Sequence, residues 1–232
     1  MRSCKICVLD SIDTSKFTKQ PFYFGGYLPY ADNQALPPTT AMSLASDSIN
    51  VDDFVKYKID HEVEEKVFGR IPGGNSFDGY IRKGFIDGFV SQKRGLVILS
   101  GKKRDILDFC AANKKMAHFK FHTVGINMKK LLALLPNVKV AWFNFDKGEI
   151  TSSALMGHCV ENTPEFKNCK DSGEISTLSF HFDYGNALHP ILITKDGTVV
   201  LQANYQERTD EIELVLKIKE ALLDKVIELP KN

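Results

Sequence analysis

Three cations follow a glycine at a turn that is predicted to lie between a buried strand and a helix, in the sequence Ser100-Gly101-Lys102-Lys103-Arg104. Cations in the first turn of a helix oppose the helix dipole, at roughly 0.3–1 kcal/mol each when weakly screened. A bound phosphate reverses this effect, because the free amides of the first turn and the cationic side chains can hold it together. The alternative is that the three long side chains extend into water. We interpret the turn as part of a binding surface.

A second basic group lies on a predicted strand, where His118, Lys120 and His122 share one face and Phe119 and Phe121 share the other. Two imidazoles that titrate near neutrality can serve as the general base and general acid of a nuclease. Four residues along a strand separate the two histidines by roughly 13–14 Å, which is too far for one scissile phosphate. The phenylalanines face away from the cations, so we expect them in the core and not stacked on nucleic acid bases.

The positive charge is concentrated in the middle of the chain. Residues 82–140 contain thirteen lysines and arginines and three acidic residues, although the net charge of the whole protein is +1. The segments before and after carry net charges of −3 and −6. This segregation predicts one basic face that meets phosphates or an acidic partner surface, unless the acidic C-terminal third neutralises it within the fold. The predicted binding residues are Lys102, Lys103, Arg104, Lys114, Lys115, His118, Lys120 and His122.

The sequence contains no catalytic or nucleotide-binding motif. A Walker A loop requires Lys and Ser or Thr after its second glycine, whereas Phe85-Ile86 follows Gly84. There is no Gly-x-Gly-x-x-Gly fingerprint and no Gly-x-Ser-x-Gly nucleophile turn. Scattered residues can still assemble an active site, so the missing motifs favour a non-catalytic protein without excluding an enzyme. We name no catalytic residue and expect no cofactor.

Metal-binding patterns are incomplete. The pair in Cys4-Lys5-Ile6-Cys7 lies in a strand-like alternation, where residues three apart face opposite sides, so we expect these cysteines to pack in the core. In His61-Glu62-Val63-Glu64-Glu65, a glutamate replaces the second histidine of a zinc-protease helix. Several later cysteines and histidines have spacings that match no common metal site. They are His158, Cys159, Cys169, His181 and His189. We expect no bound metal.

The composition is that of an ordinary globular protein, with 232 residues, 43% hydrophobic and 25% charged. No apolar run approaches the roughly 18 residues that a membrane helix needs, and the N-terminus lacks the apolar segment of a signal peptide. An odd number of scattered cysteines, five, does not indicate a disulfide framework. We therefore expect a cytoplasmic protein that does not associate with membranes.

Residues 1–92 are predicted to form an irregular N-terminal region, rich in glycine, proline and aromatic residues, with one helix. That helix spans Val51 to Phe68, where apolar residues recur every three or four positions. Asp-Gly pairs favour positive-φ turns, so Asp78-Gly79 and Asp87-Gly88 predict two tight reversals.

Residues 93–232 are predicted to form an α+β core, in one compact unit with the N-terminal region. The order is strand, helix, strand, helix, then hairpins, and a C-terminal amphipathic helix from the cap Asp210 to Leu229. The strands are expected at 95–100, 118–124, 138–145, 150–156, 175–184, 191–194 and 198–203, and the first two helices near 106–116 and after the cap Asn127. Hairpin turns are predicted at Asp146-Lys147-Gly148 and at Asp196-Gly197. Consecutive hairpins favour a mixed or largely antiparallel sheet with flanking helices.

Two functions are consistent with these patterns. The first is a non-catalytic cytosolic protein that binds a macromolecular partner, a protein more than a nucleic acid, through the basic central face. Inhibitors, immunity-type proteins and accessory proteins belong to this class. The second is a nucleic-acid-binding or phosphodiester-processing protein that uses the same face, with His118 or His122 in proton transfer. The oligomeric state and the partner do not follow from the sequence.

Overall fold

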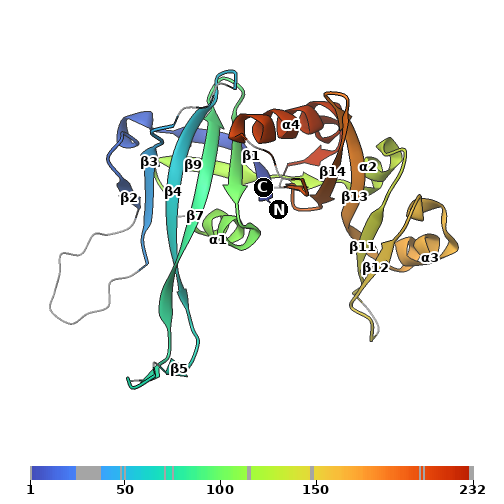
Figure 1. Cartoon of the computed structure of the whole chain (residues 1–232), viewed down its shortest axis with the longest axis horizontal. Helices are drawn as coiled ribbons and strands as arrows, with labels where there is room; N and C mark the ends of the chain where they lie inside the picture. The colour runs from blue at the N-terminus through green and yellow to red at the C-terminus, as the bar shows by residue number, and fades with distance from the viewer. Residues whose placement is uncertain are drawn as a thin grey trace. The chain divides into compact units, whose positions relative to one another are not determined.

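A computed structural model describes residues 2–24, 38–47, 49, 51–70, 72–74, 76–113, 116–146, 149–203, 205 and 207–229 (Figure 1). The chain divides into two compact units, which are described one at a time. Unit 1 consists of Met1–Val8, Asn50–Asp52 and His122–Asn232, and unit 2 of Leu9–Ile49 and Asp53–Phe121. In the described residues, helices and a large antiparallel sheet coexist, which confirms the predicted α+β fold. No helix in this part of the chain is long and apolar enough to cross a membrane.

Unit 2 is an antiparallel sheet with the strand order β8-β7-β4-β3-β2 and one helix. Its strands are β2 (Phe22–Phe24), β3 (Thr40–Leu44), β4 (Val55–Glu65), β5 (Gly69–Arg70), β6 (Ser76–Phe77), β7 (Tyr80–Ser91) and β8 (Leu96–Gly101). The helix α1 (Lys103–Asn113) follows β8, and a short 3-10 turn, η1 (Thr14–Lys16), precedes β2. Two strands belong to unit 2 in part, the C-terminal end of β1 (Arg2–Ile12) and the N-terminal end of β9 (Phe119–Thr123).

The prediction of a helix from Val51 to Phe68 is wrong, because β4 occupies most of this segment. β4 pairs with β7 from Val55 opposite Val90 to Glu65 opposite Tyr80. Apolar residues four positions apart share one face of a strand as well as one face of a helix, so their spacing fits both elements. The buried residues Tyr57, Ile59 and His61 alternate with more exposed ones, and this period of two identifies the strand.

The two Asp-Gly pairs have different structures. Asp78-Gly79 separates β6 from β7, whereas Asp87-Gly88 lies inside β7, so the second predicted reversal is wrong. A Cβ atom at Gly88 would lie 3.0 Å from Cδ1 of Ile59, and the glycine therefore makes room for this buried side chain on β4.

Aromatic side chains form the centre of the unit 2 core. Phe109 of α1 packs against Phe119 and Phe121 at the start of β9, with ring centroids 6.4 and 5.8 Å away. Phe17, after η1, contacts both Phe119 and Tyr57. The predicted strand at β9, with its phenylalanines in the core, is confirmed, as are β8 and α1.

Unit 1 contains the sheet order β12-β11-β13-β14-β15-β1, in which Arg2 to Lys5 of β1 pair with β15. Its strands are β10 (Gly125–Ile126), β11 (Val140–Asn144), β12 (Ser152–Met156), β13 (Glu174–Tyr184), β14 (Ala187–Thr194), β15 (Thr198–Leu201) and β16 (Ile227–Glu228). Its helices are α2 (Met128–Leu134), α3 (Pro164–Ser172) and α4 (Arg208–Ala221), with the 3-10 turns η2 (Val160–Asn162) and η3 (Leu223–Lys225).

Most predicted elements of unit 1 are present. Asn127 caps α2 by accepting a hydrogen bond from the amide of Lys130. The Asp-Gly turn joins β14 to β15, with Gly197 at a φ of 79°, and β11 and β12 form the other hairpin. Lys147 and Gly148 in the predicted turn of that hairpin lie outside the described residues.

The C-terminal helix differs from its prediction at both ends. α4 begins after Glu207 instead of the predicted cap Asp210, and Glu207 makes no side-chain capping bond. The helix ends at Ala221, because Ile227 and Glu228 leave the helical path and pair with β10. An additional helix, α3, was not predicted, although Thr163 accepts a hydrogen bond from the amide of Phe166 and Pro164 occupies the first helical position.

Candidate functional site

In unit 2, β4 and β7 continue beyond both neighbouring strands. The last pair between β3 and β4 is Thr40 with His61, and the last pair between β7 and β8 is Ile86 with Gly101. The remaining ends of β4 and β7 therefore form a two-stranded ribbon that carries the small β5–β6 hairpin (Figure 1). We call residues 62–83 the arm.

Arg82 joins the base of the arm to α1. Its Nε atom lies 2.8 Å from Oε1 of Glu65 on β4, and its Nη2 atom lies 2.6 Å from Oδ2 of Asp108 on α1. Its Nη1 atom donates to Asp105, a buried residue one helical turn before Asp108. The hydrogen bond to Glu65 is the largest cause of a pKa of Arg82 above its ordinary range. The hydrogen bond to Asp105 and the negative charges of Asp105 and Asp108 act in the same direction.

Glu65 also binds Arg104, one of the three cations predicted at the turn before α1. The Nη2 atom of Arg104 lies 2.6 Å from both carboxylate oxygens of Glu65. The hydrogen bond from Arg82 is the largest cause of a lowered pKa at Glu65, and the bond from Arg104 acts in the same direction. The anion that meets this end of the basic turn therefore comes from the chain itself.

Lys102 and Lys103 are exposed, as Arg104 is, but they have no ion pair with any residue that the structure describes. Among the residues that the structure describes, no carboxylate lies within 4.0 Å of either ammonium group. Lys103 is the first residue of α1, and Lys102 immediately precedes it. The N-terminal end of α1 therefore carries two uncompensated positive charges where the helix dipole is also positive.

Apolar side chains are exposed along the arm. Phe68 is 82% exposed, and Val67, Tyr80 and Ile81 are each close to half exposed. Glu65 lies opposite Tyr80 in the strand register and also contacts Arg104, so the exposed part of the arm begins beside the basic end of α1. We call the combined group the arm surface. Its members are Val67, Phe68, Tyr80, Lys102 and Lys103.

Gly84 on β7 and His61 on β4 lie directly opposite each other, and Gly84 is two residues from Arg82 along β7. A Cβ atom at Gly84 would lie 2.7 Å from Cγ of Asp105, so only glycine leaves room for that carboxylate. His61 is buried, its Nδ1 atom lies 2.8 Å from Oγ1 of Thr40, and its ring packs against Phe109. Burial lowers the pKa of His61, which keeps the imidazole neutral.

His118 and Lys120 do not join Lys102 to Arg104 in one cluster. α1 has eleven residues, about 16 Å, and its last residue, Asn113, binds the backbone of Phe119 and Phe121 at the start of β9. His118 and Lys120 therefore lie near the opposite end of α1 from Lys102. His118 lies 3.6 Å from a carboxylate oxygen of Asp13 and contacts the ring of Phe22, and Lys120 is exposed.

The remaining three predicted binding residues are Lys114, Lys115 and His122. Lys114 and Lys115 lie outside the described residues. His122 is exposed and belongs to unit 1. The pair of histidines proposed for proton transfer thus contains one residue from each unit.

Cysteines and metal-ligating residues form no further site in the described part of the chain. Cys4 and Cys7 are buried on β1, as expected for core residues. Cys110, Cys159 and Cys169 are partly buried. In the described ranges, no group of three or more His, Cys, Asp or Glu side chains could hold a metal ion.

The contacts of Arg82 were not predicted from the sequence. Glu65 and Arg82 are 17 residues apart and become neighbours only through the pairing of β4 with β7. A helix at Glu65 excludes this strand pairing, so the helix prediction could not reveal the contact. The alternation of Tyr57, Ile59 and His61 in the sequence would have indicated a strand that extends to Glu65.

Comparison with known proteins does not assign this chain to a family. No protein-family model matches the sequence, and no similar sequence is found among curated proteins.

Proposed function

We propose that this protein is a non-catalytic, cytoplasmic binding protein that uses the arm surface to contact an acidic region of a protein partner. Inhibitors, immunity-type proteins and accessory proteins are the roles that suit such a surface. The observation that supports the proposal is the exposure of Lys102 and Lys103, without a carboxylate partner in the described residues, beside the exposed apolar arm. An acidic partner would offset both the lysine charges and the positive end of the helix dipole.

The mixture of apolar and cationic side chains favours a protein over a nucleic acid. Protein interfaces combine a desolvated centre, often containing Phe or Tyr, with a polar rim. Phe68 and Tyr80 are suited to the centre of such an interface, and the two lysines are suited to its rim. Rim charges mainly accelerate association and select the partner, so the interaction is expected to weaken as salt increases.

The ion pairs at the base of the arm support the proposal by restricting its movement. Glu65 contacts Arg82 on β7 and Arg104 on α1, and Arg82 in turn contacts two aspartates of α1. Holding the base of the arm against α1 lowers the entropy that binding would otherwise cost. The same contacts engage the carboxylates with arginines, which leaves them poorly suited to acid–base catalysis.

A pair of matched charge variants tests the proposal. The tagged protein, the double variant Lys102→Glu/Lys103→Glu and the control Lys129→Glu/Lys130→Glu are used to capture partners from extracts of the native cell. The control changes the charge by the same amount at exposed positions on α2 of unit 1. We expect the first variant to reduce recovery of a protein partner roughly tenfold, and the control to leave it unchanged. Equal recovery with all three proteins would refute the proposal.

The second function, nucleic-acid binding, is distinguished by a separate experiment with the purified protein. Lys102, Lys103 and Lys120 are exposed cations that could contact phosphates. If nucleic acid is the ligand, the purified protein binds RNA or DNA fragments at low salt, and the affinity falls steeply as salt is raised. The present proposal predicts no such binding in the absence of a protein partner.

A further inference from the structure

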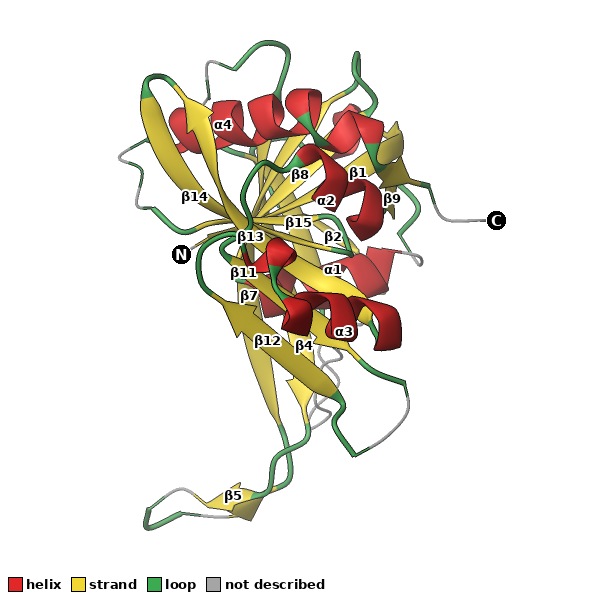
Figure 2. Ribbon diagram, turned by 90° about the vertical axis from the view of Figure 1, so that its right-hand side faces the viewer, coloured by secondary structure: helices red, strands yellow, loops and turns green. Residues whose placement is uncertain are grey.

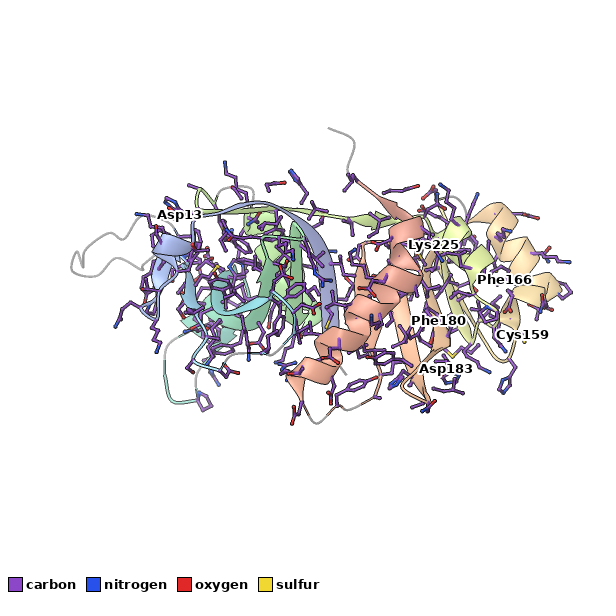
Figure 3. The ribbon with its side chains drawn as sticks, turned by 90° about the horizontal axis from the view of Figure 1, so that it is seen from above. Asp13, Cys159, Phe166, Phe180, Asp183 and Lys225 are labelled. Carbon is purple, nitrogen blue, oxygen red and sulfur yellow. The ribbon has the colours of Figure 1, made fainter. Side chains whose placement is uncertain are left out.

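Among the residues that the structure describes, β12 is the terminal strand of the unit 1 sheet and pairs on one side only, with β11. α3 follows it and contacts both β12 and β13, which flank β11, so the helix lies over a face of the sheet. Phe166 of α3, which is labelled in Figure 3, accordingly packs against Phe143 of β11, with ring centroids 5.2 Å apart. Figure 2 shows α3 beside β12. In the described part of the chain no strand pairs with the other side of β12, so this edge is open.

The hydrogen bonds of the β11–β12 hairpin show which backbone groups face this edge. The amide of Phe145 donates to the carbonyl of Thr151, and the amide of Gly157 donates to the carbonyl of Lys139. Bonded and non-bonded pairs alternate in an antiparallel ladder, so the odd-numbered residues of β12 bond to β11. The N–H and C=O groups of Ser152, Ala154 and Met156 point the other way. All three of these residues are exposed.

The open edge lacks the features that normally prevent strands from pairing. Natural edge strands carry charged residues, proline or a bulge, or are very short. Residues 150–157 read Ile-Thr-Ser-Ser-Ala-Leu-Met-Gly, with no charge and no proline. β2, the terminal strand of the unit 2 sheet, has three residues, whereas β12 has five. Backbone pairing at β12 would therefore meet no charge repulsion, even between two identical strands.

Two copies of β12 are also complementary in sequence. In an antiparallel pair centred on Ser153, Ile150 of one copy lies opposite Met156 of the other, and Ser152 lies opposite Ala154. Ile150 and Met156 are 67% and 70% exposed, so this register covers both exposed apolar side chains at each end of the contact. The even-numbered residues paired in this register are also those whose backbone N–H and C=O groups face the open edge. The register that matches the side chains therefore also allows the backbone hydrogen bonds to form.

We propose that the protein forms a two-fold symmetric dimer in which β12 pairs with β12 of a second copy, antiparallel and centred on Ser153. The contact is small, so the dimer is expected to be weak and to depend on protein concentration. This inference is independent of the arm surface, which lies on unit 2.

Disulfide cross-linking tests the register. Ser153 would face its own copy in a non-hydrogen-bonded pair, where the Cα atoms are about 4.5 Å apart, within the range that a disulfide spans. Ser153→Cys is therefore expected to form a covalent dimer under mild oxidation. The wild-type protein, with its five cysteines, serves as the control for other cross-links. Cross-linking of the variant at no more than the wild-type level would overturn the proposed register.

Sedimentation at increasing protein concentration tests the dimer without cross-linking. Ala154→Lys places a charge on the open edge, and Ala154→Pro removes an outward N–H group that β11 does not use. Both variants are expected to remain monomeric at concentrations where the wild type dimerises. Asn168→Lys, which adds the same charge at an exposed position of α3, should dimerise like the wild type. A wild type that stays monomeric at every accessible concentration would contradict the proposal, and circular dichroism confirms that each variant is folded.

Discussion

Glu65 and Arg104, 39 residues apart in the sequence, form an ion pair in which one guanidinium nitrogen lies 2.6 Å from both carboxylate oxygens. Glu65 belongs to β4 and Arg104 to the first turn of α1, so the pair connects the arm to the helix that carries the free lysines. Because Glu65 accepts from Arg82 as well, the neutralised charges form a connected group. Among the described residues, the positive charge that lacks an ion pair at this end of the helix is thereby confined to Lys102 and Lys103.

Replacing Arg82 is expected to destabilise the protein. Arg82→Ala leaves the buried Asp105 and its partners Glu65 and Asp108 without their shared donor, at a cost of about 1–3 kcal/mol in the free energy of unfolding. Arg82→Lys should recover only part of the lost free energy of unfolding, because one ammonium group cannot reach three carboxylates as a guanidinium does. Urea unfolding measures both variants. The control is Lys83→Ala, because the exposed ion pair of Lys83 with Asp60 contributes less than about 1 kcal/mol. If Arg82→Ala and Lys83→Ala lowered the free energy of unfolding equally, the ion pairs of Arg82 would not stabilise the fold as described.

Gly84→Ala is expected to disturb the same contacts from the other strand. The new Cβ atom would lie within 3.0 Å of three atoms of Asp105, so that α1 or the carboxylate must move away from Arg82. Overpacking of this kind costs typically 1–3 kcal/mol. Gly157→Ala is the matched control, because its nearest neighbour, Cγ1 of Val160, lies at an ordinary 3.4 Å. Thermal unfolding compares the two, and an unchanged midpoint for Gly84→Ala would show that Asp105 relaxes freely.

His61 makes stability depend on pH. Burial, the largest cause, lowers the pKa of His61 in the folded protein, although Asp108 and Asp105 act in the opposite direction. The unfolded chain therefore binds a proton more readily, and the stability that the neutral imidazole contributes is lost as pH falls below about 6.5. Wild type should lose stability between about pH 7.5 and pH 5.5 relative to His61→Gln, in chemical unfolding at each pH. Parallel curves for the two proteins would argue against a neutral, buried His61.

Much of the fold was predictable where local patterns were unambiguous. The Asp-Gly turn at Gly197, the cap at Asn127 and the alternation of phenylalanines around Lys120 all identified their elements correctly. In each case, the signal depends on residues within one turn or one strand. Periodicity failed from Val51 to Phe68, because spacings of four fit a helix and a strand equally well and pairing with β7 decided the outcome.

The candidate surface was predictable only in part. Lys102 to Arg104 were predicted as cations of a binding surface, but the sequence did not reveal that Glu65 neutralises Arg104, whereas no described carboxylate pairs with the two lysines. The separation of Lys120 from Lys102 along α1 also required the structure. Contacts between residues far apart in the chain depend on strand pairing and helix packing, which charge counting does not describe.

Photo-cross-linking from the arm tests the central proposal most directly. A photoreactive phenylalanine analogue replaces Phe68, which is 82% exposed on the arm, or, as a control, Leu188, which is 67% exposed on β14 of unit 1. Irradiation in the native cell is expected to attach an acidic protein to position 68 and not to position 188. The product should disappear when Lys102→Glu/Lys103→Glu is combined with the label. Absence of a specific product from position 68, or a product that survives both charge reversals, would contradict the assignment of the arm surface as the binding site.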